Sequence, residues 1–483
     1  MSHGITQSVK CTEQTEGCMS TDFSFNSTSD GWRGVIAKDF TYKSVYELIN
    51  AISSYVLKHN LDKKIVLGYD TRFMSKNFAN YAAALLNDNG IACYMLSDYS
   101  TTPLLSFATN YLDAPLGINI TASHNPPIYN GIKIRMNYGG AADKEVIRNI
   151  ECNIKHDLKK VPAFSKIEYL DPIPPYINKI ERIITLSELE NNNKKVIVDS
   201  MHGTTRNLLS RILIQTNIQV DYLHINVDPY FGGINPEPKY ESTTVLQGLV
   251  KKGQYDIGFA HDGDGDRIVA CVPRIGYLSP HDLAALLVLY LAKYKGIKGL
   301  VLGSSTLGRK TRMVCEDIGL TYKTIKVGFN NALKDMLGGN VLLAAEENGG
   351  IGFGLFLPER DATFAALLLL EANAKVGIAK LYKEVEQITG SSGFCRFNYK
   401  TSLDRKVLFQ KIINKENEFQ KIGKIKSVDH MDGLKITFIN NDWISIRISG
   451  TEDILRIYCE SSSRDKATDI KNTIVSLIKR LNK

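Results

Sequence analysis

The sequence lacks long hydrophobic runs, blocks of like charge and closely spaced cysteines. Its longest apolar stretches, residues 283–292 and 364–370, are too short to cross a bilayer, and we interpret them as buried helices. The first 26 residues are polar and have no apolar core of the kind found in secretory signals, so we expect a disordered tail there. These absences argue against a membrane protein and against a secreted one.

The charges and the cysteines indicate the kind of partner and the cellular compartment. The 59 lysines and arginines exceed the 51 acidic residues by 8 and are spread along the chain. This balance suits a small anionic substrate and argues against nucleic acid as a partner. The eight cysteines lie far apart with no C-x-x-C pair, which is typical of reduced thiols in a cytoplasmic protein.

The length of 483 residues allows three or four domains, and the hydrophobic pattern alternates strands with helices. Apolar strand-like runs that each lead into a polar loop recur in three successive units, at residues 116–120, 255–259 and 341–344. After residue 390 the pattern changes to short strands at 432–438, 443–447 and 454–458 and a final amphipathic helix, which predict a small α+β domain. We therefore expect a tail at residues 1–26 and four domains at residues 27–173, 174–273, 274–389 and 390–483.

Two of the polar loops carry the candidate chemistry. Ser123 lies in T-A-S-H-N-P, residues 121–126, and ligands of open α/β sheets bind beyond the carboxyl ends of strands. Asp262, Asp264 and Asp266 alternate with glycine in D-G-D-G-D-R, residues 262–267. Carboxylates this close raise one another's pKa unless a cation neutralises them, so the spacing favours a hard divalent metal such as Mg²⁺. The metal would bridge to a phosphate carried by Ser123.

Simpler interpretations exist for both loops. Residues 121–126 could form a capped turn, whereas a Ser-His hydrolase fits poorly because there is no G-x-S-x-G elbow. Residues 262–267 could form a solvated turn. They do not form an EF-hand, because Arg267 stands where that loop needs glycine and Pro273 where it needs a bidentate glutamate.

Two further loops complete the pattern. Residues 346–350, E-E-N-G-G, offer carboxylates and an amide suited to sugar hydroxyls. Residues 447–452, R-I-S-G-T-E, offer a guanidinium, two hydroxyls and flexible backbone N–H groups, which is how a phosphate is held. Each loop alone could be a mere turn or hairpin, but the four together describe a site for a phosphorylated polyol.

In their order along the chain these four motifs resemble the phosphoserine, magnesium, sugar-binding and phosphate-binding loops of the α-D-phosphohexomutases. Minor motifs of that family are matched at residues 30–34, 68–72, 129–133, 235–238, 324–328 and 360–361. The resemblance implies three mixed-sheet α/β domains and a C-terminal α+β, TATA-binding-protein-like domain around a central cleft. It also implies a phosphoglucomutase or phosphomannomutase activity, which interconverts hexose 1-phosphate and hexose 6-phosphate through a phosphoserine and a hexose 1,6-bisphosphate.

The resemblance assigns a role to each site residue. Ser123 would carry the phosphoryl group, with Arg33, His124 and Lys133 assisting, and Mg²⁺ would bind the Ser123 phosphate and Asp262, Asp264 and Asp266. The expected substrate contacts are Arg267, Gly328, Glu346, Asn348, Arg447, Ser449, Gly450 and Thr451. Glucose or mannose 1,6-bisphosphate would act as activator. We expect a monomer or homodimer that acts on a small hexose phosphate, without a nucleic-acid or membrane partner.

The chain departs from the family pattern at four positions. Asn348 stands where serine is common, and Gly350 stands where some members have a histidine proposed as a base. Ile448 and Asp453 replace small residues or prolines around the phosphate loop. The sugar loop favours glucose or mannose, with glucosamine phosphate as the nearest competitor. The same motifs would also fit a hexose 1,6-bisphosphate synthase or a catalytically idle sugar-phosphate sensor.

Overall fold

The computed structural model describes residues 26–28, 30–155, 166–190, 194–401, 403–449 and 454–482. Residues 1–25 of the expected tail lie outside the described residues, and so do residues 450–453 of the expected phosphate loop.

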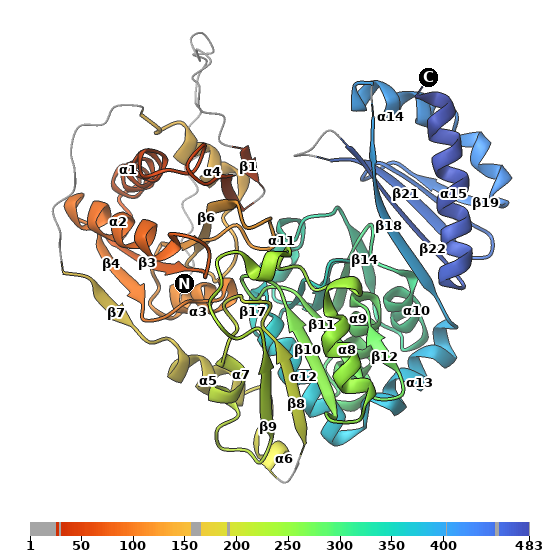
Figure 1. The fold of residues 1–483 in the computed structure, drawn as a ribbon, viewed down its shortest axis with the longest axis horizontal. Coiled ribbons are helices and arrows are strands. Elements are labelled where there is room, and N and C mark those ends of the chain that lie inside the picture. Colours follow the sequence, from red (N-terminus) through yellow and green to blue (C-terminus); the bar gives the residue numbers. More distant parts are fainter. Residues whose placement is uncertain are drawn as a thin grey trace, which may run out of the picture.

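The described residues form four β-sheets, each built from its own stretch of the chain (Figure 1). The first three sheets are mixed and carry helices, and the fourth is antiparallel. This architecture confirms the predicted fold class. We call the four units the first to fourth domains. In Figure 1 the first and fourth domains lie on opposite sides of the view, with the second and third between them.

The first domain has the strand order β1-β2-β6-β5-β3-β4-β7. Its strands are β1 (Asn26–Thr28), β2 (Gly31–Val35), β3 (Lys64–Tyr69), β4 (Ala92–Leu96), β5 (Leu116–Ile120), β6 (Tyr129–Met136) and β7 (Glu168–Leu170). Its helices are α1 (Tyr42–Lys58), α2 (Ser75–Asp88), α3 (Thr102–Tyr111) and α4 (Lys144–Glu151).

The second domain has the strand order β12-β11-β10-β8-β9. Its strands are β8 (Lys195–Asp199), β9 (Gln219–Leu223), β10 (Ile257–His261), β11 (Ile268–Val272) and β12 (Gly276–Leu278). Its helices are α5 (Ile173–Glu181), α6 (Ser187–Glu190), α7 (Leu208–Ile212) and α8 (Thr244–Lys251), with the short turns η1 (Phe231–Gly233) and η2 (Glu241–Thr243).

The third domain has the strand order β14-β13-β15-β16-β17. Its strands are β13 (Leu300–Ser304), β14 (Tyr322–Ile325), β15 (Val341–Ala345), β16 (Ile351–Phe353) and β17 (Leu357–Arg360). Its helices are α9 (Pro280–Leu289), η3 (Tyr290–Tyr294), α10 (Arg309–Asp317), α11 (Asn330–Leu337), α12 (Ala362–Lys375) and α13 (Ile378–Thr389).

The fourth domain has the strand order β18-β22-β21-β20-β19. It contains β18 (Gly393–Lys400), β19 (Ile425–Asp429), β20 (Leu434–Phe438), β21 (Trp443–Ile448) and β22 (Ile454–Ser461), with α14 (Arg405–Ile413), η4 (Glu416–Lys421) and α15 (Arg464–Leu481). The sequence pattern predicted β20, β21, β22 and α15 but not β18, β19 or α14. Both missed strands are edge strands. β19 is exposed at four of its five positions and β18 has only one buried residue, so neither shows the run of buried apolar residues that marks the central strands.

The first three sheets share the same strand connectivity. In each, a central strand (β3, β8 or β13) lies between two parallel partners, and the second partner turns back into an antiparallel strand. The turns β5–β6, β10–β11 and β15–β16 are therefore equivalent. They contain residues 121–128, 262–267 and 346–350, so three of the four candidate loops leave their sheets at the same point.

The strands that lead into these turns are buried along their whole length, as the apolar runs predicted. The second and third domains share one hydrophobic core, which also includes residues of α3. The fourth domain has a core of its own, formed by its sheet together with α14 and α15. Its core is thus separate from the one that the second and third domains share.

The apolar run at residues 364–370 lies in α12, which is buried as predicted. Asp361 begins this helix by accepting a hydrogen bond from the Phe364 N–H group at 2.9 Å. Across the described residues, no single helix is long and apolar enough to cross a membrane. The pair α12 and α13 meets the length and composition test only when combined, and it bends by 95°.

Candidate active site

The Ser123 loop is fixed in a strained conformation by a buried arginine. Ser123 has a φ angle of 54°, in the left-handed region that non-glycine residues rarely adopt. The Arg72 guanidinium donates four hydrogen bonds of 2.5–2.9 Å to this loop, to the carbonyl oxygens of Ser123, Asn125, Pro126 and Tyr129. Its Nε lies 3.1 Å from Asp70 Oδ2. The loop therefore presents Ser123 from a rigid frame.

The three aspartates form a compact buried group next to Ser123. Asp262 accepts hydrogen bonds from the N–H groups of Asp266 and Arg267, at 2.9 and 3.1 Å, which closes the turn. Ser123 Oγ lies 3.3 Å from Asp262 Oδ2. One ligand oxygen from each aspartate lies within 4.8 Å of the others.

The charge balance of this group fits a divalent cation. The Oδ1 atoms of Asp264 and Asp266 are buried without a hydrogen-bond partner among the described residues. Burial, followed by the charges of Asp266 and Asp264, raises the pKa of Asp262 well above its ordinary value. Hard carboxylate oxygens that converge in this way are ligands that Mg²⁺ accepts. The triad can therefore hold a metal.

Lys133 neutralises part of this negative charge. Its Nζ lies 2.7 Å from Asp264 Oδ2 and 3.1 Å from Asp266 Oδ2. Burial lowers the pKa of Lys133, but the charges of Asp264, Asp266 and Asp30 outweigh burial and raise it. The side chain is therefore an ammonium ion at neutral pH. Its expected part in proton transfer stays a prediction, and its geometry favours an electrostatic role.

His124 and Arg33 both contact the Ser123 loop. His124 Nδ1 lies 3.4 Å from Ser123 Oγ. Burial, together with the charges of Arg267 and Arg33, holds the pKa of His124 well below 6.5, so the imidazole is neutral. Arg33 donates a hydrogen bond of 2.8 Å to Asn125 Oδ1. Both side chains are partly exposed, so an incoming molecule can reach them.

Arg267 is held beside the metal group by Glu237. Its Nη1 donates to Glu237 Oε1 at 3.2 Å, and its Nε lies 3.8 Å from carboxylate oxygens of both Asp262 and Asp266. Glu237 also lies 3.7 Å from Arg396 of β18. One carboxylate thus connects the second domain to the fourth.

The sugar loop is joined directly to the metal loop. The Ile268 N–H group donates to the Gly349 carbonyl at 3.0 Å. Arg360 reaches both loops, at 2.7 Å to Asp266 Oδ2 and 3.3 Å to Glu346 Oε2. A Cβ atom on Gly350 would lie 2.5 Å from Arg360 Cδ, so the glycine at this position makes room for the arginine.

Glu346 and Asn348 differ in exposure. Glu346 is buried, and its Oε1 accepts a hydrogen bond of 3.0 Å from the Gly328 N–H group. Asn348 and Glu347 line a cavity of about 1120 Å³ between the second, third and fourth domains. Its lining also includes Glu237 but not Ser123, the three aspartates or Arg447, so it borders the candidate site on the side of the sugar loop.

The fourth loop is described only in part. Arg447 lies at the end of β21, with its Nη2 2.9 Å from Asp432 Oδ1. Ser449 is buried, and its N–H group donates to the Ile454 carbonyl at 3.1 Å. Gly450, Thr451 and Asp453 lie outside the described residues.

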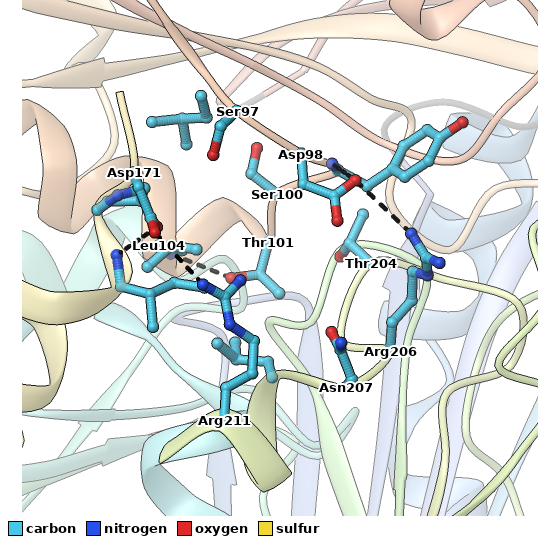
Figure 2. Close-up of a pocket in the computed structure, with 15 residues that line it drawn as sticks. Ser97, Asp98, Ser100, Thr101, Leu104, Asp171, Thr204, Arg206, Asn207 and Arg211 are labelled. Atoms are coloured by element: carbon cyan, nitrogen blue, oxygen red, sulfur yellow. Dashed lines mark hydrogen bonds and ion pairs between the residues drawn. The ribbon is translucent and has the colours of Figure 1, made fainter. Parts of the chain in front are cut away.

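A second hollow lies between the first and second domains (Figure 2). Its volume is about 30 Å³, which is room for a water molecule but not for a sugar. The labelled side chains include Asp98 and Arg206, which form an ion pair of 3.6 Å across it. Thr101 borders this hollow, and the next residue, Thr102, donates to Asp264 Oδ2 at 2.5 Å. The hollow therefore adjoins a residue that contacts the metal loop, but its lining includes neither Ser123 nor any of the three aspartates.

Sequence reasoning missed several residues that build this site. Three of them, Arg72, Glu237 and Arg360, lie in the minor motifs. The motifs marked these positions as part of the family pattern but did not indicate what the residues do. Thr102 carried no signal, because its contact with Asp264 spans 162 positions in sequence. Glu347 was visible in the sugar loop but was not singled out as facing the cavity.

Comparison with known proteins agrees with this arrangement. Models of the four phosphoglucomutase/phosphomannomutase domains match the chain: α/β/α domain I at residues 26–160, domain II at 174–276, domain III at 279–389 and the C-terminal domain at 408–477. A phosphoglucomutase/phosphomannomutase of Thermococcus kodakarensis is 27% identical over 455 residues, which cover 93% of this chain and 97% of the relative.

Two other relatives extend the comparison. A phosphoglucosamine/phosphogalactosamine mutase of Sulfurisphaera tokodaii is 28% identical over 473 residues, with 93% of this chain and 98% of the relative covered. The crystal structure of a protein assigned as a phosphomannomutase from Thermus thermophilus superposes with a TM-score of 0.82 at 28% identity, covering 94% of this chain and 99% of that one. The chain therefore belongs to the phosphoglucomutase/phosphomannomutase family of the α-D-phosphohexomutase superfamily.

Proposed function

We propose that the protein interconverts the 1-phosphate and the 6-phosphate of glucose or mannose through a phosphoryl group carried by Ser123. The observation that carries this proposal is the position of Ser123 Oγ, 3.3 Å from Asp262 Oδ2 in a buried group of three carboxylates. A hydroxyl in that position is suited to carry a phosphate that shares a cation with the aspartates.

The surrounding charges suit phosphoryl transfer. A phosphoserine carries a charge of about −1.5 to −2, and Lys133, Arg33 and Arg267 lie around it as cations. Mg²⁺ on the three aspartates would neutralise the phosphoryl oxygens during transfer. As the acceptor hydroxyl of a hexose monophosphate bonds to phosphorus, the bond from phosphorus to Ser123 Oγ breaks. The neutral His124 is the candidate to accept the hydroxyl proton and return it to Ser123 Oγ.

This first transfer gives a hexose 1,6-bisphosphate, which must turn over to return its other phosphate to Ser123. In the second transfer the serine hydroxyl is the acceptor and the sugar oxygen leaves, taking back the proton. Glu346 and Asn348 would hold sugar hydroxyls in both orientations, and Arg447 would hold the phosphate that is not reacting. Glucose or mannose 1,6-bisphosphate would therefore serve as activator by loading Ser123.

Glucosamine phosphate is the alternative substrate, and Glu347 is what favours it. This carboxylate lines the cavity next to Asn348, where Ser304 and Thr306 donate to its Oε2 at 3.3 and 2.6 Å. An anchored carboxylate within the sugar loop would suit the ammonium group of glucosamine. The similarity to a phosphoglucosamine/phosphogalactosamine mutase supports this alternative.

The experiment is turnover on glucose, mannose, glucosamine and N-acetylglucosamine 1-phosphates with Mg²⁺ and a trace of glucose 1,6-bisphosphate. We expect 6-phosphate product from glucose or mannose, and none from Ser123→Ala. Product from glucosamine 1-phosphate alone would show that glucosamine phosphate is the substrate. A folded protein that turns over none of the four sugars, or a Ser123→Ala variant of normal activity, would contradict it.

A further inference from the structure

Asp432 joins the arginine of the phosphate loop to the third domain. Asp432 lies in the turn between β19 and β20, and its side chain is 12% exposed. Oδ1 accepts a hydrogen bond of 2.9 Å from Arg447 Nη2. Oδ2 accepts hydrogen bonds from Ser305 Oγ at 2.6 Å and from the Val327 N–H group at 2.8 Å. One carboxylate therefore contacts Arg447 within its own domain and two groups across the domain boundary.

The contacts continue from the third domain to the metal loop. Gly328, the neighbour of Val327, donates its N–H group to Glu346 at 3.0 Å. Glu346 pairs with Arg360, and Arg360 pairs with Asp266 at 2.7 Å. The position of Arg447 is thus set relative to the sugar and metal loops and not only within the fourth domain.

The turn is shaped to bring this carboxylate against Arg447. Gly433 has a φ angle of 99°, and a Cβ atom there would collide with the Ile446 carbonyl and lie 3.0 Å from Arg447 Cγ. Only glycine allows this approach. Arg456 is the residue directly opposite Arg447 on β22. Because like charges directly opposite on neighbouring strands are destabilising, a carboxylate beside Arg447 offsets this repulsion.

We propose that Asp432 is a positioning residue that orients Arg447 toward the non-reacting phosphate of the substrate and fixes its distance from the sugar loop. This inference rests on the proposed phosphate-binding role of Arg447. Asp432 takes one of the five N–H donors of the guanidinium, which leaves four. Among these is Nε, which is buried without a partner among the described residues.

An opposite role can be stated for the same contact. If Asp432 merely competed with phosphate for Arg447, removing its charge would tighten phosphate binding. If it orients Arg447, removing its charge would weaken binding, because the side chain must then be ordered by the ligand itself. The two roles therefore predict changes of opposite sign.

The test is calorimetric binding of glucose 1,6-bisphosphate to the full-length chain in a Ser123→Ala background, where no phosphoryl transfer occurs. Asp432→Asn keeps the shape and one acceptor oxygen but removes the charge. We expect it to raise Kd by about tenfold, the scale of a hydrogen bond to a charged group. Ser305→Ala removes only the hydrogen bond from the third domain to Asp432, and it should raise Kd by a smaller factor. Asp469→Asn, an exposed carboxylate on α15, is the matched control and should leave Kd unchanged.

A second measurement separates positioning from a general loss of structure. In the otherwise unmodified protein, Asp432→Asn should raise the concentration of added bisphosphate needed for half-maximal turnover, because a loosely held intermediate escapes more often. Its melting temperature should stay within a few degrees of the parent. An Asp432→Asn variant that binds bisphosphate as tightly as the parent, or more tightly, overturns the inference. Loss of turnover on all sugars in the unmodified protein would instead overturn the proposed function, while the calorimetric result would still decide the role of Asp432. If the Ser123→Ala parent binds no bisphosphate, both fail.

Discussion

Replacing Arg72 by lysine tests whether catalysis depends on the frame of the Ser123 loop. The guanidinium directs its four Nη hydrogens to four loop carbonyls, and its Nε faces Asp70 at 3.1 Å. An ammonium group has three donors, so at least two of these five interactions are lost. At about 1.5 kcal/mol or more for each hydrogen bond to a charged group, the loop loses about 3 kcal/mol.

We expect kcat/KM of Arg72→Lys to fall by about 100-fold or more, since 1.4 kcal/mol corresponds to a factor of ten. Amide hydrogen exchange in residues 121–131 should speed up, while exchange in the fourth domain should not change. Arg148→Lys, on the exposed face of α4, is the control and should behave as the parent. An Arg72→Lys enzyme with kcat/KM within threefold of the parent would refute the idea that this frame sets the position of Ser123.

Three other predictions follow from the same structure. Chelation of divalent metal should abolish turnover, and added Mg²⁺ should raise the melting temperature of the parent but not of Asp264→Asn; equal shifts would place the metal elsewhere. Burial raises the pKa of Asp361 from 3.8 to about 7, so the folded protein keeps this proton to higher pH than the unfolded chain. The free energy of unfolding should therefore fall as pH rises from about 4 to about 7, and Asp361→Asn should flatten that slope in thermal melts; an unchanged slope would contradict the assignment. Gly350→His should lower kcat/KM, because its Cβ would displace Arg360 from Asp266 and Glu346, and a rise in activity would show that the arginine is dispensable.

The strands that carry the candidate loops could be predicted from the sequence because they are buried and uninterrupted. Ser123 and the aspartates could be predicted as a pair because each follows such a strand, and the structure brings Ser123 Oγ within 3.3 Å of Asp262. Sequence reasoning works here because the chemistry and the local fold are encoded in the same short segment.

The supporting residues could not be predicted in the same way. Arg72 acts on a loop 51 to 57 positions away, and Thr102 acts on one 162 positions away, so their partners depend on how whole sheets pack. The edge strand β18 was missed because only its first residue is buried, so it lacks the continuous apolar run that marks the central strands. The direction of Glu347 into the cavity depends on the turn after β15, which residue type alone does not determine.

The shared strand connectivity of the first three sheets has a consequence for how substrate preference can change. The proposed phosphoryl carrier, metal site and sugar loop each occupy the same turn in a different sheet, so each proposed task lies in its own hairpin. Substitution of Asn348, which lines the cavity, can alter the sugar that is accepted, whereas changes at Gly349 or Gly350 would also disturb the metal loop through Ile268 and Arg360. Divergence toward a new hexose phosphate can therefore begin at a single position of one hairpin.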